Sequence, residues 1–263
     1  MAEPDTPRSV FAGKTGHSAE HPVRALSHDE IAQILVAHRL YMETERRQGR
    51  RADLGSADLS GTDFSGLNLR RIKMDRAVLR DVNLSRTCLQ RANLIGATLE
   101  RAHLDSADLS GARLSGANLS SATLENACLA EADMEFALAT EAVLRDACLR
   151  AADMSGAILD SAVLTRADLR AANLRGAGLR DARLDDADLR DARLGGAFLV
   201  GASLRGADLR GAYLRLARLD GADLSGANLY GTEGLMQAQI DRAHCDAGTK
   251  LPDGLAGMDD GGG

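Results

Sequence analysis

The stretch from residue 51 to residue 231 repeats one five-residue phrase without a break, as in ADLSG at 107–111 and ANLSS at 117–121. Leucine, or a residue that replaces it, stands at every fifth position from Leu54 to Leu229, which makes 36 consecutive copies. Ala139 alone brings a small side chain to that position. A repeat of constant length determines the architecture of a chain.

A period of five is incompatible with an amphipathic helix. Five residues advance an α-helix by about 500°, so leucines at that spacing would spread around the whole cylinder. In an extended chain the alanine and the leucine, two residues apart, point to one side and the residue between them points away. The two polar or glycine residues that follow form a corner. The repeat therefore predicts a coil of short strands and turns, filled by leucine and alanine, with successive coils paired as parallel strands about 4.8 Å apart.

With its consensus A-(D/N)-L-x-x, the stretch resembles the pentapeptide-repeat family over all 36 copies. The resemblance implies an all-β solenoid, a right-handed four-sided parallel β-helix with four copies in each coil. Residues 20 apart would then stack, and the copies would form about nine coils in a rod roughly 43 Å long. The methionines that replace leucine fall in one 20-residue column, which favours this coil length independently: Met74, Met134 and Met154.

The segments on either side of the repeats are predicted to cap the coil ends, because open ends expose apolar interior and unpaired strand edges. We expect a disordered segment at 1–26, an N-terminal capping helix within 27–49 and the repeat β-helix at 50–231. A C-terminal cap with a short helix is expected at 232–255, followed by a flexible tail at 256–263.

The first helix is expected over residues 28–47. Ser27 and Glu30 form a capping box at its start, and apolar residues recur at helical spacing behind them. Gly49 is expected to end the helix. His38 lies on its apolar side, where we expect a residue that packs against the first coil rather than a ligand. The short C-terminal helix is expected within 234–243.

Composition limits the classes of function. The net charge is −6, which does not favour non-specific binding to nucleic acid. There is no apolar run long enough to span a membrane and no ordinary secretory signal, so a cytoplasmic protein is expected. The four cysteines contain no C-x-x-C pair and are expected to be reduced thiols rather than a zinc site: Cys88, Cys128, Cys148 and Cys245.

Two surface features stand out from the regular pattern. Residues 134–163 bring apolar side chains to positions that the repeat normally gives to polar ones, and this candidate interaction surface comprises Phe136, Leu138, Val143, Ile158 and Val163. It is interpreted as a contact surface, a buttressed kink or simply β-propensity at a sheet surface. The second is a ladder of arginines 20 residues apart, interpreted as a solvated surface with local pairing or as a stripe for an anionic partner: Arg150, Arg170, Arg190 and Arg210.

No motif for chemistry is found. The six histidines form no metal-binding pair, and no nucleophile elbow or Walker-type sequence is present. The carboxylates before the leucines are the consensus residues of the repeat, and a filled interior provides no cleft. We therefore predict that the protein is not an enzyme, with no catalytic, cofactor-binding or metal-binding residue and no cofactor.

The leading hypothesis is a structural, protein-interaction protein that presents a rigid surface to a protein partner, as a monomer or an end-to-end homodimer. The family resemblance implies two alternatives. Some pentapeptide-repeat proteins mimic duplex DNA and bind type II topoisomerases, such as gyrase, to inhibit or protect them, and some are bacterial effectors. DNA mimicry needs a pronounced negative surface, whereas the repeats here carry a net charge of only −2 and a basic run near their start.

Overall fold

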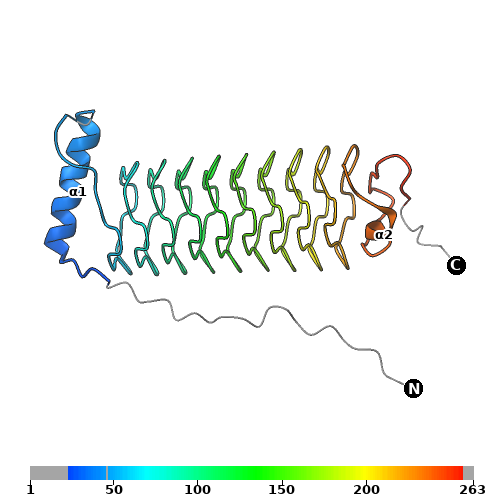
Figure 1. Cartoon of the computed structure of the whole chain (residues 1–263), viewed down its shortest axis with the longest axis horizontal. Coiled ribbons are helices and arrows are strands. Elements are labelled where there is room, and N and C mark those ends of the chain that lie inside the picture. Colours follow the sequence, from blue (N-terminus) through cyan, green and yellow to red (C-terminus); the bar gives the residue numbers. More distant parts are fainter. Residues whose placement is uncertain (1–22, 46, 257–263) are drawn as a thin grey trace, which may run out of the picture.

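The computed structural model describes residues 23–45 and 47–256. The disordered segment expected at residues 1–22 and the flexible tail expected at 257–263 lie outside this range. The described chain is a rod of stacked coils, with helix α1 (His28–Glu43) at one end and helix α2 (Gln237–Ile240) at the other (Figure 1). No helix in this part of the chain is long and apolar enough to cross a bilayer.

Successive coils are joined by backbone hydrogen bonds between residues about 20 apart. Parallel bridges pair Asp53 with Lys73 and continue in the same register as far as Tyr213 with Glu233. At each step the leucine N–H donates to a carbonyl of the next coil, as from Leu54 to Lys73 (2.7 Å), while the Lys73 N–H donates back to Ala52 (3.1 Å). A register of 20 gives four copies to each coil, so the coil has four sides.

The interior contains the two small or apolar positions of each copy. Every leucine position from Leu54 to Leu229 is buried, including Ala139, and so are nearly all the alanines two residues earlier. Leu67 is an exception at 38 % exposure, because it lies in the first coil, at the open end. Alternation along a strand accounts for this division between inside and outside.

Each corner is a tight turn that requires a left-handed residue. The alanine N–H donates to the carbonyl of the preceding leucine, as from Ala57 to Leu54 (3.2 Å). The residue before the alanine has a φ of +53° to +70°, whether it is glycine, as at Gly116 (+63°), or not, as at Arg101 (+56°). A β-turn with positive φ at its third residue accounts for this geometry. The repeat predicted the corners but not their backbone conformation.

The outward residue of each strand defines four faces. Face one carries Asp53 and every twentieth residue after it, face two Asp58, face three Asp63 and face four Asn68, each continued in the same way. The corner between faces one and two holds residues 55–56 and their stacked equivalents. Residues five apart thus lie on adjacent faces, and only residues in one 20-residue column share a face.

Helix α1 is shorter than expected. The Ser27–Glu30 capping box is present, but the helix ends at Glu43, with Thr44 as its C-cap, rather than near residue 47. The Thr44 hydroxyl donates to the Leu40 carbonyl and accepts from the Gln48 N–H, and this stops the helix five residues before Gly49. Gly49 instead lets the chain turn back against the helix, since a Cβ there would lie 2.2 Å from the Ala37 oxygen.

The chain before α1 also differs from expectation at Arg24, which falls in the segment predicted to be disordered. Arg24 pairs with Ala57 as a parallel strand: its N–H donates to Ser56 (2.7 Å) and its carbonyl accepts from Asp58 (3.3 Å). The reason is that the first coil has backbone groups with no preceding coil to bond, and a short strand satisfies them.

At the C-terminal end the hydrogen-bonded ladder extends beyond residue 231, where the pentapeptide pattern stops. His244 pairs with Asp223 and Lys250 with Asn228, at spacings of 21 and 22 because the chain here carries extra residues. Helix α2 is a single turn, shorter than the predicted 234–243, and Ile240 buries its side chain. The same need to pair the last coil explains the extra strands.

Candidate functional site

Face two carries an apolar strip that crosses four coils. Leu138 pairs with Ile158, Ile158 with Gly178, and Gly178 with Phe198, all as parallel neighbours. Leu138 and Ile158 are 38 % and 40 % exposed, Gly178 is buried, and Phe198 is half-buried beneath the guanidinium of Arg180, 4.8 Å from its ring centre. We call these four residues the face-two strip.

The corner beside this strip bears two further exposed apolar side chains. Phe136 is 62 % exposed and Leu216 is 74 % exposed, although both occupy the left-handed position. The glycines between them in the same column leave room: the Phe136 ring lies over Gly156, where a Cβ would approach it to 2.5 Å, while Gly176 and Gly196 have open space. The corner therefore has two apolar knobs separated by flat glycine positions.

The structure divides the predicted interaction surface between two faces. Leu138 and Ile158 are neighbours on face two, beside Phe136, as the 20-residue register requires. Val143 and Val163 are neighbours on face three, around a corner, so they do not extend the same surface. Sequence reasoning missed Gly178 and Phe198, which continue the face-two strip, and Leu216 at the adjoining corner. Counting further along the same columns would have found them.

The charges around the face-two strip change sign along the rod. Its edges carry Glu135, Glu141 and Asp160 beside Leu138 and Ile158, and then Arg175 and Arg180 beside Gly178. Arg215 and Arg218 lie in the following coils. Asp160 is paired with Arg180 (3.3 Å), but within residues 23–45 and 47–256 neither Glu135 nor Arg175 takes part in an ion pair. Asp220 pairs with Arg218 (3.4 Å), so the charge changes sign most clearly along the corner from Glu135 to Arg175 and Arg215.

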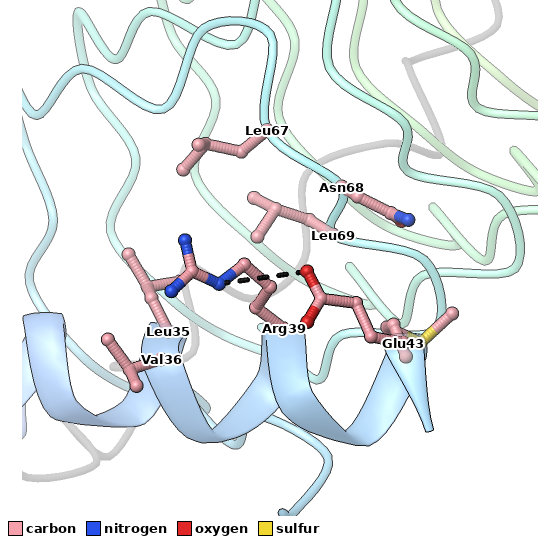
Figure 2. A pocket seen from close by; sticks show the side chains of 8 residues that line it. Leu35, Val36, Arg39, Glu43, Leu67, Asn68 and Leu69 are labelled. Carbon is pink, nitrogen blue, oxygen red and sulfur yellow. Dashed lines mark ion pairs between the residues drawn. The ribbon is translucent and has the colours of Figure 1, made fainter. Parts of the chain in front are cut away.

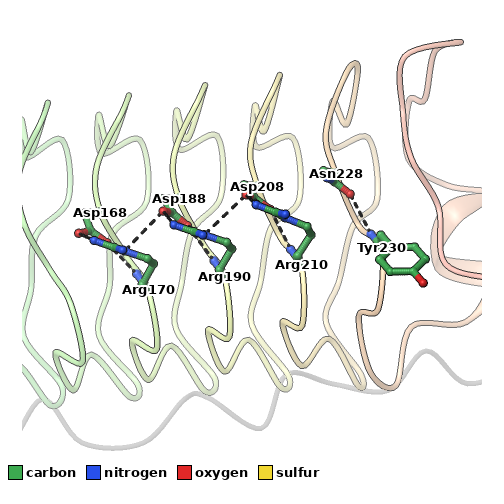
Figure 3. A network of polar contacts seen from close by, with 8 residues as sticks. All are labelled: Asp168, Arg170, Asp188, Arg190, Asp208, Arg210, Asn228 and Tyr230. Atoms are coloured by element: carbon green, nitrogen blue, oxygen red, sulfur yellow. Dashed lines mark hydrogen bonds and ion pairs between the residues drawn. The ribbon is translucent and has the colours of Figure 1, made fainter.

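The arginine ladder is an internally paired network on the edge of face four. Arg170, Arg190 and Arg210 each bind, through Nε and one terminal nitrogen, the aspartate two residues earlier, at 2.6–2.8 Å (Figure 3). Arg170 and Arg190 also reach the aspartate of the next coil, at 3.5 and 3.6 Å. These bonds hold the pKa of Asp168 and Asp208 below the usual range.

Arg150 is the exception in this ladder. Where the other arginines have an aspartate two positions earlier, Arg150 has Cys148. The Cys148 thiol stacks on that of Cys128 in the previous coil, both are free, and burial raises the pKa of Cys148. Since the other three arginines are neutralised by their aspartates, the ladder as a whole is a poor stripe for an anionic partner.

A groove of about 370 Å³ lies between α1 and the first coil. Leu35, Val36 and Met42 line it from the helix, and Leu67 and Leu69 from the coil (Figure 2). The Arg39–Glu43 ion pair, at 3.9 Å, lies at its edge. The groove offers apolar contact without a nucleophile or an acid–base pair.

His38 is buried between α1 and the start of the first coil. Its side chain is 1 % exposed, and its Nδ1 accepts the Ala52 N–H at 3.1 Å. Burial, with a smaller contribution from Arg51, lowers the pKa of His38. Within the part of the chain that the structure describes, no three His, Cys, Asp or Glu side chains converge on a point that could hold a metal ion.

Sequence and structural comparisons place this geometry in a family. The family model for pentapeptide repeats matches with eight copies, over residues 57–94, 83–120, 117–156, 162–199, 182–219 and 197–233. The chain belongs to the pentapeptide-repeat family, whose fold is a right-handed quadrilateral β-helix, and no catalytic family is indicated. No curated protein matches the sequence.

Several solved structures are similar to this chain. HetL, a pentapeptide-repeat protein involved in heterocyst differentiation regulation in the cyanobacterium Nostoc, is 29 % identical, with a TM-score of 0.55 over 87 % of this chain and 98 % of its own. Rfr23 of the cyanobacterium Cyanothece is 31 % identical over 37 % of this chain and 66 % of its own, with a TM-score of 0.33. QnrB1, a plasmid-mediated fluoroquinolone resistance protein, is 20 % identical over 74 % and 90 %, with a TM-score of 0.44.

Proposed function

We propose that this chain is a non-enzymatic interaction protein that binds a protein partner through face two. The observation that carries this proposal is the face-two strip, with Phe136 beside it: Leu138 and Ile158 expose apolar side chains in one line, on a rod whose outward positions are mostly polar or charged. Apolar patches rimmed by charge are typical of protein-binding surfaces. The likeness to HetL, which is involved in regulation, supports a role exerted through contacts.

In this proposal the rod is a rigid display of about nine coils, closed by α1 at one end and by the residues around α2 at the other. The backbone of each outward residue is held by hydrogen bonds to the neighbouring coils, so little backbone conformational entropy is lost when a partner binds. The spacing of about 4.8 Å between coils then determines which partner surfaces fit.

Topoisomerase binding by mimicry of DNA is less well supported. The longest run of stacked aspartates, Asp168, Asp188 and Asp208, is neutralised by arginines on the same edge. Acidic residues gather between Glu100 and Glu141, but Arg101 and Arg113 lie among them, and residues 70–91 before them are mainly basic. A partner that binds DNA would meet no continuous negative stripe, which is what mimicry requires.

A capture experiment with two matched variants tests the proposal. Full-length protein is immobilised in three forms: unchanged, Leu138→Glu/Ile158→Glu on face two, and Val143→Glu/Val163→Glu on face three. We expect a protein recovered from the native host's lysate by the unchanged and face-three forms but lost from the face-two form. Equal loss in both variants, or none in either, would reject face two as the binding surface. Circular dichroism verifies that both variants remain folded.

A further inference from the structure

Within the proposed function, which assigns face two to protein binding, we propose that the partner is a second copy of this chain, packed face to face with its rod axis antiparallel. The two-fold axis runs along the strands of face two, midway between the coils of Ile158 and Gly178. This midpoint is also the centre of the face-two strip, so the pairing overlaps the two strips completely.

The shape of face two is self-complementary under this rotation. Leu138 of one copy lies opposite Phe198 of the other, and Ile158 lies opposite Gly178, which has no side chain of its own. The carboxylate of Asp160 lies beside Gly178, 2.8 Å from where a Cβ would be, and is held there by the Arg180 N–H (2.9 Å). At the centre, Ile158 thus meets a position without a side chain of its own, bordered by a carboxylate that is already paired with Arg180.

The adjoining corner follows the same rule. The rotation keeps each corner on its own side of the interface, so Phe136 faces Gly196 of the second copy and Leu216 faces Gly116. Gly196 and Gly116 have nothing within 4 Å of a virtual Cβ, which leaves space for the incoming side chains. Along this corner the order of apolar side chains and glycines is therefore such that each apolar side chain of one copy meets a glycine of the reversed copy.

Charge selects the antiparallel orientation. Glu135 of one copy lies opposite Gly195 of the other, between Arg175 and Arg215, which are one coil away on either side. All three charged side chains are exposed, and within residues 23–45 and 47–256 none of them is in an ion pair. In a parallel face-to-face arrangement the two corners of face two would be exchanged at the same coil, and Glu135 would face Glu141. Opposite charges across an interface fix orientation in this way.

The contact is small, so the dimer is expected to be weak. Six coils at about 4.8 Å and a face about 10 Å wide give roughly 300 Å² on each copy before side-chain contacts are added. Interfaces burying less than about 1,200 Å² in total belong to weak or transient associations. The dissociation constant is therefore expected at tens to hundreds of micromolar, within reach of sedimentation measurements.

Sedimentation equilibrium of the full chain, from about 5 to 500 µM, tests the proposal. We expect reversible dimers that weaken at least several-fold when salt is raised from about 0.05 to 0.5 M. Glu135→Arg alone, or Arg175→Glu with Arg215→Glu, should each abolish dimers. An equimolar mixture of these two variants should dimerise again, because both charge contacts are then complementary. Glu131→Arg, an equal charge change at a different corner, should leave the dimer unchanged.

A chain that stays monomeric at every concentration would overturn the proposal. Dimers whose dissociation constant is unchanged by Glu135→Arg would also overturn it, because they would have to form through another surface, such as an end of the rod. Either result would leave the proposed function intact if the face-two variant still lost a captured protein. If the captured protein were lost equally from all variants, the proposed function would be rejected. The dimer would then be supported by the sedimentation data alone.

Discussion

At the scale of the residue, the corners carry a conformational demand that the repeat does not display. The left-handed position is filled by glycine in some copies and by Arg, Asp, Glu or Ser in others, at closely similar φ. A non-glycine residue in this region costs of the order of 1 kcal/mol. The chain thus carries some twenty small backbone penalties, offset by bonding between coils.

A glycine at such a corner is therefore expected to stabilise the fold. Gly221 has φ +69° and open space around a virtual Cβ, so Gly221→Ala should lower the free energy of unfolding by about 1 kcal/mol through backbone strain alone. Ser161→Ala at the same corner, already at φ +60°, should change it by less than about 0.5 kcal/mol. Urea denaturation measures both, and equal effects would contradict the strain argument.

Interior leucines are expected to be far more costly to remove. Leu159 is fully buried, with Ala139 stacked before it and Leu179 after it. Leu159→Ala should cost about 2–5 kcal/mol and lower the urea midpoint accordingly, because it places two small residues side by side in one column. Ile158→Ala, one residue away but 40 % exposed, serves as the control and should cost clearly less. Equal costs would argue against the assigned inward and outward positions.

At the scale of the element, prediction from sequence succeeded where alternation decides the outcome and failed where longer-range pairing does. The buried positions follow from strand alternation, and the capping box of α1 was visible in Ser27 and Glu30. Arg24 could not be predicted as a strand, because only the unpaired edge of the first coil holds it there. Phe198 was overlooked because its neighbours in sequence are regular, and its significance lies in the column it shares with Ile158.

The arginine ladder makes stability depend on acid pH. Arg170 and Arg210 hold the pKa of Asp168 and Asp208 low, so their contribution is present above the unfolded value near 4 and is lost as pH falls through the folded value. Between pH 5 and pH 2 the urea midpoint of the Asp168→Asn/Asp208→Asn variant should fall less than that of the unchanged protein. The difference should be up to about 0.3 M for each Asp–Arg pair removed. Asn228 in the same column, accepting the Tyr230 N–H, indicates that asparagine fits. An identical fall in both proteins would refute the assignment.

Helix α1 is expected to loosen from the first coil as the pH falls, because His38 is buried there in its neutral form. The folded pKa of His38 lies below its unfolded value of about 6.5, so the neutral ring stabilises the helix fully above that value and progressively less as pH falls. Hydrogen exchange at Ala52, corrected for intrinsic rates, should accelerate at least several-fold between pH 7.5 and pH 5.5. His38→Asn keeps an acceptor for Ala52 but cannot titrate, and should remove this dependence. Its persistence in the variant would exclude His38 as the cause.

At the scale of the whole molecule, function follows from how four faces divide a periodic sequence. Residues five apart in sequence point in different directions, while residues 60 apart, such as Leu138 and Phe198, form one surface. The rod therefore brings distant, individually unremarkable residues onto one line. Face two is the line on which apolar exposure, glycine gaps and a reversal of charge coincide.

Site-directed photo-crosslinking in the native host is the measurement that best tests whether face two binds the partner. A photoreactive phenylalanine analogue is placed at Ile158 on face two, or at Val163, its neighbour around the corner on face three. We expect a crosslinked protein from position 158 and little or none from position 163, with mass spectrometry identifying the adduct as a second copy of the chain. A different protein at position 158 would retain the interaction surface and reject the self-pairing. Equal products from both positions, or none from position 158, would contradict the claim that face two is where this protein binds its partner.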